Sequence, residues 1–273
     1  MFYSTAPKNG LGATVRTLEL IYHTAVRNVR KTHNNAVLAI LMNMLQIALM
    51  VVVFYVMFSI LGLRAFAVRG DFLLYIMSGI FLYLTHLKAV GAVAGADGPS
   101  SAMMQHAPMN TAISIAGNIL STLYVQVISM LMVLFIYHVA FTPLVIEDPV
   151  GAFAMFLLAF FTGLGVGLIL LAIKPWAPAF VSIFMTIYTR ANMIASGKMF
   201  VANTLPGYML AMFDWNPLFH CIDQARGYAF VNYFPRNSSW EYALWVGITL
   251  LMIGLMGEFY TRKHVSLSWG ARR

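Results

Sequence analysis

The sequence predicts an all-α membrane protein with six transmembrane helices, an N-terminal amphipathic helix at the interface, and a re-entrant helix pair between the fifth and sixth spans. Of its 273 residues, 60% are hydrophobic and 10% are charged, whereas a soluble domain carries about 25% charged residues. The apolar residues form long runs, and about 20 such residues in a helix cross the hydrocarbon layer. A soluble fold of this size would still need a polar surface. We therefore treat residues 1–273 as one transmembrane domain.

Residues 13–32 are predicted to form the amphipathic helix. Its apolar residues recur at spacings of three and four: Val15, Leu18, Tyr22, Val26 and Val29. Its other side carries the basic residues Arg16, His23, Arg27, Arg30 and Lys31. A basic amphipathic helix is typical of a segment that lies on a membrane surface. The alternative is a helix that binds a soluble partner.

Six apolar runs are expected to cross the membrane, and polar turns separate them. The expected spans are residues 36–61, 72–92, 113–141, 151–173, 177–195 and 241–260. Residues 93–112 form a polar break between the second and third spans, and they contain two prolines and two glycines. The sequence shows neither a second domain nor an internal repeat.

The basic residues divide unevenly between the two sides of this bundle. With both ends inside, ten lie on the cytoplasmic side: Lys8, Arg16, Arg27, Arg30, Lys31, Lys174, Arg262, Lys263, Arg272 and Arg273. Five lie outside: Arg64, Arg69, Lys198, Arg226 and Arg236. Because cytoplasmic loops carry the excess of Lys and Arg, we expect a multi-pass protein of the bacterial inner membrane with both termini in the cytoplasm. This placement accounts for the net charge of +8 without a nucleic-acid partner.

Residues 196–239 are too interrupted for a further span and too apolar for an ordinary loop. Prolines and glycines cut stretches that are rich in aromatic residues and methionine. Helices that do not cross the membrane are tolerated at membrane depth only where they pack on protein or line a wet cavity. We therefore interpret this segment as two short re-entrant helices that enter from the outer face.

No motif in the sequence supplies catalysis. The pattern G-x-x-x-x-G-K-[ST] that cradles ATP phosphates is missing, since Met199 follows Gly197-Lys198. The seven histidines include no pair spaced by three or four residues, which disfavours a helical metal site. Asp214 and Asp223, with Glu241, could imitate catalytic carboxylates, but no nucleophile or base accompanies them. We expect that this chain is not an enzyme and binds no metal or cofactor of its own.

Several residues within the spans have two readings. Gly163, Gly165 and Gly167 alternate in the fourth span, and we interpret them as sites of close helix packing rather than dinucleotide binding. Lys88 and Arg190 are ionisable residues at membrane depth. Such residues face a protein interior or a pathway, or their charged ends reach the interface. We expect the charged end of Lys88 to reach the interface. For Arg190, both this arrangement and a position that faces the protein interior or a pathway remain open.

A series of residues near the C-terminus resembles one known family. Ser196-Gly197, Pro206, Asn216-Pro217-Leu218, His220 and Arg226 occur in the same order as in the membrane-spanning subunits of type-2 ABC exporters for capsular polysaccharide, O-antigen and teichoic acid. The basic helix before the first span and the loop before the third are also similar. Asn34-Asn35-Ala36 departs from the family, which often has Leu-Gly and a tryptophan there.

The resemblance implies an ATP-driven permease for a polysaccharide or lipid-linked glycan. Such a permease forms a homodimer and binds two copies of a separate ATPase subunit, which holds the ATP and magnesium. The cytoplasmic loop would supply a coupling helix that contacts the ATPase: Ala102, Met103, Met104, Gln105, His106, Ala107, Pro108 and Met109. The re-entrant pair would form an outer gate.

Aromatic and cationic side chains would suit a sugar polymer that moves along a channel, because rings stack on sugars and arginine binds anionic groups. The channel and gate candidates are Tyr188, Arg190, Trp215, Asn216, Pro217, Phe219, His220, Arg226 and Tyr228. Trp176 is a further aromatic candidate, although tryptophan and tyrosine also collect at membrane interfaces. The alternatives are a permease for a drug or small lipid, a membrane enzyme such as a lipid-linked transferase, and a structural membrane protein.

Overall fold

The computed structural model describes residues 10–31, 35–62, 71–98 and 110–264. Within these ranges the regular secondary structure is entirely helical. The helices are α1 (Gly10–Lys31), α2 (Ala36–Ile60), α3 (Phe72–Ala94), α4 (Thr111–Ala140), α5 (Pro149–Ile173), α6 (Pro178–Ala195), η3 (Ala202–Thr204), α7 (Gly207–Leu210), α8 (Pro217–Ala229) and α9 (Trp240–His264). The long helices begin and end within a few residues of the predicted ones.

Side-chain caps determine where α2, α3, α4 and α5 begin. The carboxylate of Asp71 accepts hydrogen bonds from the first backbone N–H groups of α3, and Asp148 does the same for α5. The side chains of Asn35 and Asn110 cap α2 and α4 in the same way. Such caps satisfy N–H groups that have no partner within the helix, so each helix starts directly after a polar residue.

Within the described residues, five helices are long and apolar enough to cross a membrane: α2, α3, α4, α5 and α9. The chain is therefore a multi-pass, all-α membrane protein. The predicted fifth span, residues 177–195, corresponds to α6, which is shorter than these five helices and is not among them. Arg190 and Asn192 lower its hydropathy.

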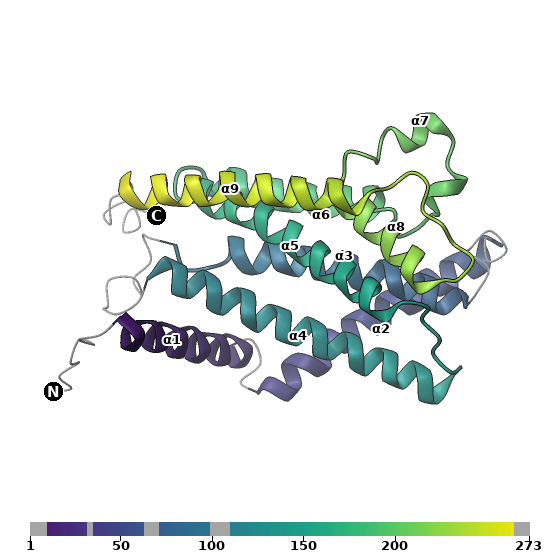
Figure 1. The fold of residues 1–273 in the computed structure, drawn as a ribbon, viewed down its shortest axis with the longest axis horizontal. Coiled ribbons are helices and arrows are strands. Elements are labelled where there is room, and N and C mark those ends of the chain that lie inside the picture. Colours follow the sequence, from purple (N-terminus) through teal and green to yellow (C-terminus); the bar gives the residue numbers. More distant parts are fainter. Residues whose placement is uncertain (1–9, 32–34, 63–70, 99–109, 265–273) are drawn as a thin grey trace.

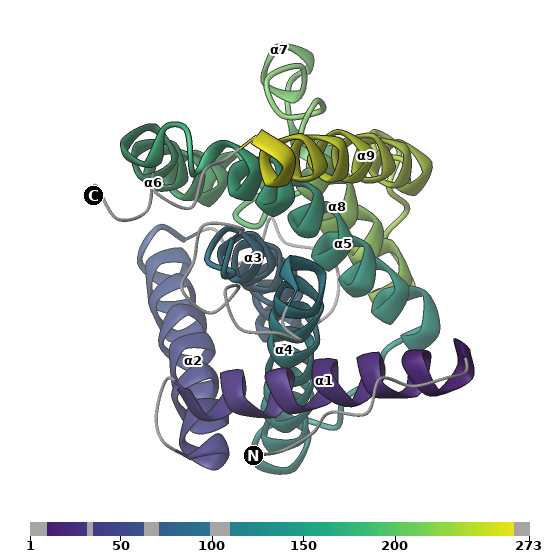
Figure 2. The same cartoon turned by 90° about the vertical axis from the view of Figure 1, so that its left-hand side faces the viewer.

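The long helices run side by side, and α1 lies across one end of the bundle (Figures 1 and 2). The C-terminal end of α9 lies at this same end, which we call the α1 end. The segment from η3 to α8 lies toward the opposite end (Figure 1). The chain thus keeps its short helices away from α1.

Glycines bring α5 into close contact with two neighbours. A Cβ atom on Gly163 would lie 2.6 Å from the backbone oxygen of His86 in α3. A Cβ on Gly165 would lie 2.7 Å from the side chain of Leu250 in α9. Residues without a side chain allow such close approach between membrane helices. The packing interpretation of the glycine pattern is therefore confirmed.

Three of the five predicted apolar residues of the amphipathic helix α1 face outward, and the other two, Val26 and Val29, are partly buried. Val15, Leu18 and Tyr22 are exposed on the molecule, whereas Ala25 is buried. A Cβ on Gly117 of α4 would lie 2.5 Å from the Thr24 side chain, so α1 crosses α4 at this glycine. The apolar side of α1 is left free to face a membrane interface.

Candidate functional site

Asn216 joins the start of α8 to the end of α6. Its side-chain oxygen accepts a hydrogen bond from the Leu218 N–H at 3.1 Å, which caps α8, and Pro217 occupies the first turn. Its amide nitrogen donates to the side-chain oxygen of Asn192 and to the carbonyl of Ala195, both at 3.0 Å. Proline suits this position because its missing N–H would have no partner there. The Asn-Pro pair therefore holds two helices together.

Arg226 binds the turn that follows α6. Its guanidinium donates hydrogen bonds to the carbonyl oxygens of Gly197, Lys198 and Phe200 at 3.0, 2.9 and 2.7 Å. It also lies 4.2 Å from the ring centre of Tyr75 in α3. The side chain is 1% exposed. Because a buried charge is tolerated only with good partners, Arg226 shapes this turn against α8 and α3.

Lys198 lies in the same turn, and its ammonium group lies near two aromatic rings. The nitrogen is 3.3 Å from the ring centre of Tyr83 and 5.1 Å from that of Phe54. It makes no hydrogen bond with any residue that the structure describes. Burial lowers the pKa of Lys198 from 10.5 to about 7. The turn approaches α3 closely at Gly79, where a Cβ would lie 2.9 Å from the Lys198 side chain.

Asp223 is held by hydroxyl groups. Tyr233 donates to one carboxylate oxygen, and Ser238 donates to the other at 2.7 Å. Burial and the nearby Asp223 carboxylate raise the pKa of Tyr233. The pair of donors ties α8 to the connection that leads into α9. This geometry is that of a structural carboxylate that fixes a loop.

His220 bridges the two ends of the connection around α8. Its Nε2 donates to the carbonyl of Asp214 at 2.5 Å, and its Nδ1 accepts from the Ser239 N–H at 3.0 Å. These partners assign the neutral ring with its proton on Nε2. Burial lowers the pKa of His220, although Asp214 and Asp223 oppose the shift. The ring also lies 4.5 Å from that of Tyr242 in α9.

Polar contacts attach α6 to α3 and α5. The Nε2 atom of His86 is 2.7 Å from the hydroxyl of Tyr188, and its Nδ1 atom is 3.0 Å from the carbonyl of Ala159. The Tyr83 hydroxyl donates to the carbonyl of Thr189 at 3.4 Å. His86 is completely buried. One histidine thus connects three helices at membrane depth.

The remaining surface of α6 has both polar and apolar residues. Ser182, Thr186 and Arg190 are exposed at spacings of four residues, which places them on one face of the helix. Ile183 and Ile187 are exposed beside them, at 61% and 60%. Arg190 makes no hydrogen bond or ion pair with the described part of the chain. A polar stripe of this kind needs water or protein as its neighbour within a membrane.

The structure separates the predicted channel and gate residues into two groups. Arg190 and Trp215 are exposed, and Trp215 is 64% exposed. Phe219 is buried against the Gly197 turn, like the Asn216, His220 and Arg226 side chains described above, and Tyr228 is half-buried. The residues predicted to couple to an ATPase, 102–109, lie outside the described residues.

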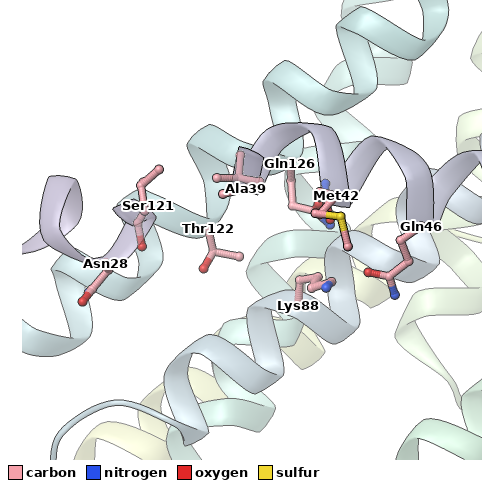
Figure 3. A pocket seen from close by; sticks show the side chains of 11 residues that line it. Asn28, Ala39, Met42, Gln46, Lys88, Ser121, Thr122 and Gln126 are labelled. Carbon is pink, nitrogen blue, oxygen red and sulfur yellow. Dashed lines mark hydrogen bonds between the residues drawn. The ribbon is translucent and has the colours of Figure 1, made fainter. Parts of the chain in front are cut away.

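A separate polar pocket lies toward the α1 end, where α1, α2, α3 and α4 meet (Figure 3). Its volume is about 400 Å³. Its lining residues are Asn28, Val29, Ala39, Met42, Asn43, Gln46, Lys88, Ser121, Thr122, Val125 and Gln126. The Lys88 side chain lies in the space between α2 and α4. Lys88 makes no ion pair or hydrogen bond with any described residue.

Side-chain amides hold the walls of this pocket. Asn43 of α2 donates to the Gln126 oxygen at 2.5 Å, and the Gln126 amide donates to the Thr85 hydroxyl of α3 at 3.4 Å. Asn28 of α1 donates to the Asn118 oxygen of α4. Because buried amides are costly without partners, this network fixes how the four helices meet. The pocket is therefore a built feature with a polar frame.

Groups of three or more His, Cys, Asp or Glu side chains that could hold a metal ion are missing from the described ranges. No protein-family model matches the chain, and no curated protein matches it. The functional assignment therefore depends on the residues and their geometry.

Sequence reasoning missed three residues of these sites. His86 receives no role in the sequence analysis because no other histidine lies three or four residues away. Lys198 is considered there as a basic residue of the outer side and as part of an incomplete phosphate-binding motif, but not as a buried residue. Gln126 drew no attention within an apolar run. A polar residue inside a predicted span is itself the signal that could have identified His86 and Gln126.

Proposed function

We propose that this chain is the membrane-spanning subunit of an ATP-driven exporter that moves a polysaccharide or a lipid-linked glycan across a bacterial inner membrane. Five apolar helices, the interfacial helix α1 and the short helices of residues 196–239 support this layout. The C-terminal motif residues that resemble the polysaccharide exporters include Asn216 and Arg226, whose contacts organise that segment.

The observation that carries the proposal is the exposed polar stripe of Ser182, Thr186 and Arg190 on α6. A membrane helix with an unpaired arginine needs a wet or protein surface beside it. A second copy of the chain, placed against this side, would enclose a polar path between the two α6 helices. Hydroxyl and guanidinium groups would then contact the hydroxyl and phosphate groups of a glycan.

ATP hydrolysis in this proposal belongs to a separate ATPase subunit. The sequence lacks the ATP phosphate-binding motif, and residues 102–109 are the expected contact. Binding of ATP would bring two ATPase subunits together and shift the spanning helices from one arrangement to another. For this shift, the complex must bind ATP with a different affinity in each arrangement. Both termini would lie in the cytoplasm.

The test uses the bacterium that carries the gene. Deletion is expected to remove the surface glycan and to leave polymer inside the cell, and the wild-type gene should restore export. Arg190→Gln should reduce export several-fold with normal protein levels, whereas Arg236→Gln, at an exposed position in the loop before α9, should not. An unchanged surface glycan after deletion would refute the proposal that the chain exports this glycan.

The ATPase partner has its own test. The purified chain alone should hydrolyse no ATP, whereas the complex of the chain with its ATPase subunit should hydrolyse ATP. A cysteine at Gln105 should form a cross-link to the ATPase subunit, and a cysteine at Asn237 should form none. ATP hydrolysis by the purified chain alone would contradict the proposal.

A second candidate, a permease for an apolar drug or small lipid, is favoured by one observation. A cavity of about 630 Å³ lies between α3, α4, α5 and α8, and its lining is mostly apolar. Phe135 and Phe153 belong to this lining. Such a volume fits a drug-sized ligand. Increased sensitivity to apolar compounds after gene deletion, with normal surface glycan, would support this candidate over the first.

A further inference from the structure

We propose that the polar pocket of Figure 3 binds the phosphodiester headgroup of an anionic membrane phospholipid. The pocket combines one unpaired cation with amide and hydroxyl groups, and it lies where four helices meet near the α1 end. The proposal concerns a lipid that stays with the protein. It is independent of the exported cargo and of the ATPase.

The charge of the pocket matches a single negative charge. Lys88 is the one charged residue among those that line it, and none of them is a carboxylate. A phosphodiester carries one negative charge, which one ammonium group balances. A diphosphate would bring further charges without further cations. The amine of a zwitterionic headgroup would find no acidic lining residue.

Hydrogen-bond donors remain free around this cation. The ammonium of Lys88 offers three donors, and none has a partner in the described part of the chain. The side chains of Gln46 and Thr122 also make no hydrogen bond there. Asn28 uses one of its two N–H groups to reach Asn118. Phosphate oxygens accept strong bonds from such donors, so these groups can surround a headgroup.

The depth of the pocket suits a lipid. Lys88 lies six residues before the end of α3 at Ala94, which corresponds to about 9 Å along the helix. Headgroups and interfacial groups occupy this zone next to the hydrocarbon core. Apolar residues of α2 point outward beside the pocket, since Leu41 and Leu45 are 55% and 49% exposed. Acyl chains can lie along this surface, whereas a soluble phosphate would gain nothing from it.

The test measures lipid binding to the purified, full-length protein by native mass spectrometry. Phosphatidylglycerol, an anionic phosphodiester, is compared with phosphatidylcholine, which is zwitterionic. The wild-type protein should bind one phosphatidylglycerol about tenfold more tightly, as one charge-assisted contact allows. Lys88→Gln should abolish this preference, and Lys88→Arg should retain it. The matched control is Lys263→Gln, which removes an exposed charge at the same end of the molecule and should change nothing.

The remaining outcomes overturn the proposal. If Lys88→Gln keeps the preference, Lys88 does not bind the headgroup. If Lys263→Gln loses the preference equally, the attraction comes from the general basic surface rather than from the pocket. If inorganic phosphate or glycerol 3-phosphate displaces phosphatidylglycerol at millimolar concentration, the site belongs to a soluble anion. Thermal unfolding of each variant without added lipid checks that the fold is intact. If Lys88→Gln is unstable, Lys88→Met removes the same charge, and a preference that it keeps would overturn the proposal.

Discussion

The guanidinium of Arg226 lies 4.2 Å from the ring centre of Tyr75 while it donates hydrogen bonds to three backbone carbonyls of the turn after α6. This arrangement joins α8, α3 and the turn at one buried side chain. A planar guanidinium can stack on a ring and bond in its own plane at the same time, which an ammonium cannot do. The C-terminal segment depends on this residue for its path.

Arg226→Met is therefore expected to destabilise the protein by about 3–5 kcal/mol, because three buried carbonyl groups lose their charged donor. Arg226→Lys should recover only part of this loss, since one ammonium cannot replace the planar fork. Arg236→Gln, at an exposed position, is the control. The measurement is unfolding in detergent. Equal stability of Arg226→Met and the wild type would show that the turn does not need these bonds.

Gly163 is expected to tolerate no side chain. In Gly163→Ala, the new Cβ would lie 2.6 Å from the carbonyl oxygen of His86, and the required backbone shift should cost about 1–3 kcal/mol. Gly91→Ala is the matched control within a helix, because its Cβ would meet nothing within 4 Å. That variant should be up to about 1 kcal/mol more stable. Similar unfolding curves for both variants would contradict the close α3–α5 packing.

Lys198 should make stability depend on pH. Its folded-state pKa is about 7, against an ordinary value of 10.5, so between these values the unfolded chain binds more protons than the folded one. Stability therefore rises with pH through this window and is lowest below pH 7. Lys198→Met should remove the dependence and raise the melting temperature at pH 6. Lys263→Met, at an exposed lysine, should keep the dependence. A wild-type melting temperature that is constant from pH 7 to 10 would refute this prediction.

His220 should lower stability in acid. Its pKa is below the ordinary value of 6.5, so the neutral ring contributes fully above that value, and the contribution is lost as pH falls through the folded-state pKa. Protonation would put a hydrogen on Nδ1, where the Ser239 N–H already donates. His220→Gln should reduce the loss of stability between pH 7 and 5. His23→Gln on the exposed side of α1 should leave it unchanged, and the reverse ranking would exclude His220 as the cause.

The helices were predictable because their signals are local. Asp71 and Asp148 precede apolar runs and cap them, and one difference between the predicted and observed helix starts comes from such a cap. The fourth span was expected to begin at residue 151, but Asp148 and Pro149 start α5 two residues earlier. The close packing at the alternating glycines of α5 was also predictable, because three small residues within an apolar run allow neighbouring helices to approach closely.

The sites were less predictable because their residues are distant in the sequence. Nothing local indicates that Arg226 binds the turn at 197–200 or that His86 contacts Tyr188. Asn216, His220 and Arg226, which the sequence analysis names together, all make side-chain contacts within residues 192–239. Their burial was not expected, since a gate residue and a structural residue have the same amino-acid type.

Residue order alone was enough to predict an all-α membrane protein and its long helices, because hydropathy, helix caps and proline act over a few residues. Which polar groups meet depends on how those helices pack. The fold places the Arg226 guanidinium against the Tyr75 ring and brings the Asn216 amide to the Asn192 side chain. A buried polar group is stable only beside a particular partner, and partners that are distant in the sequence come together only when the chain folds.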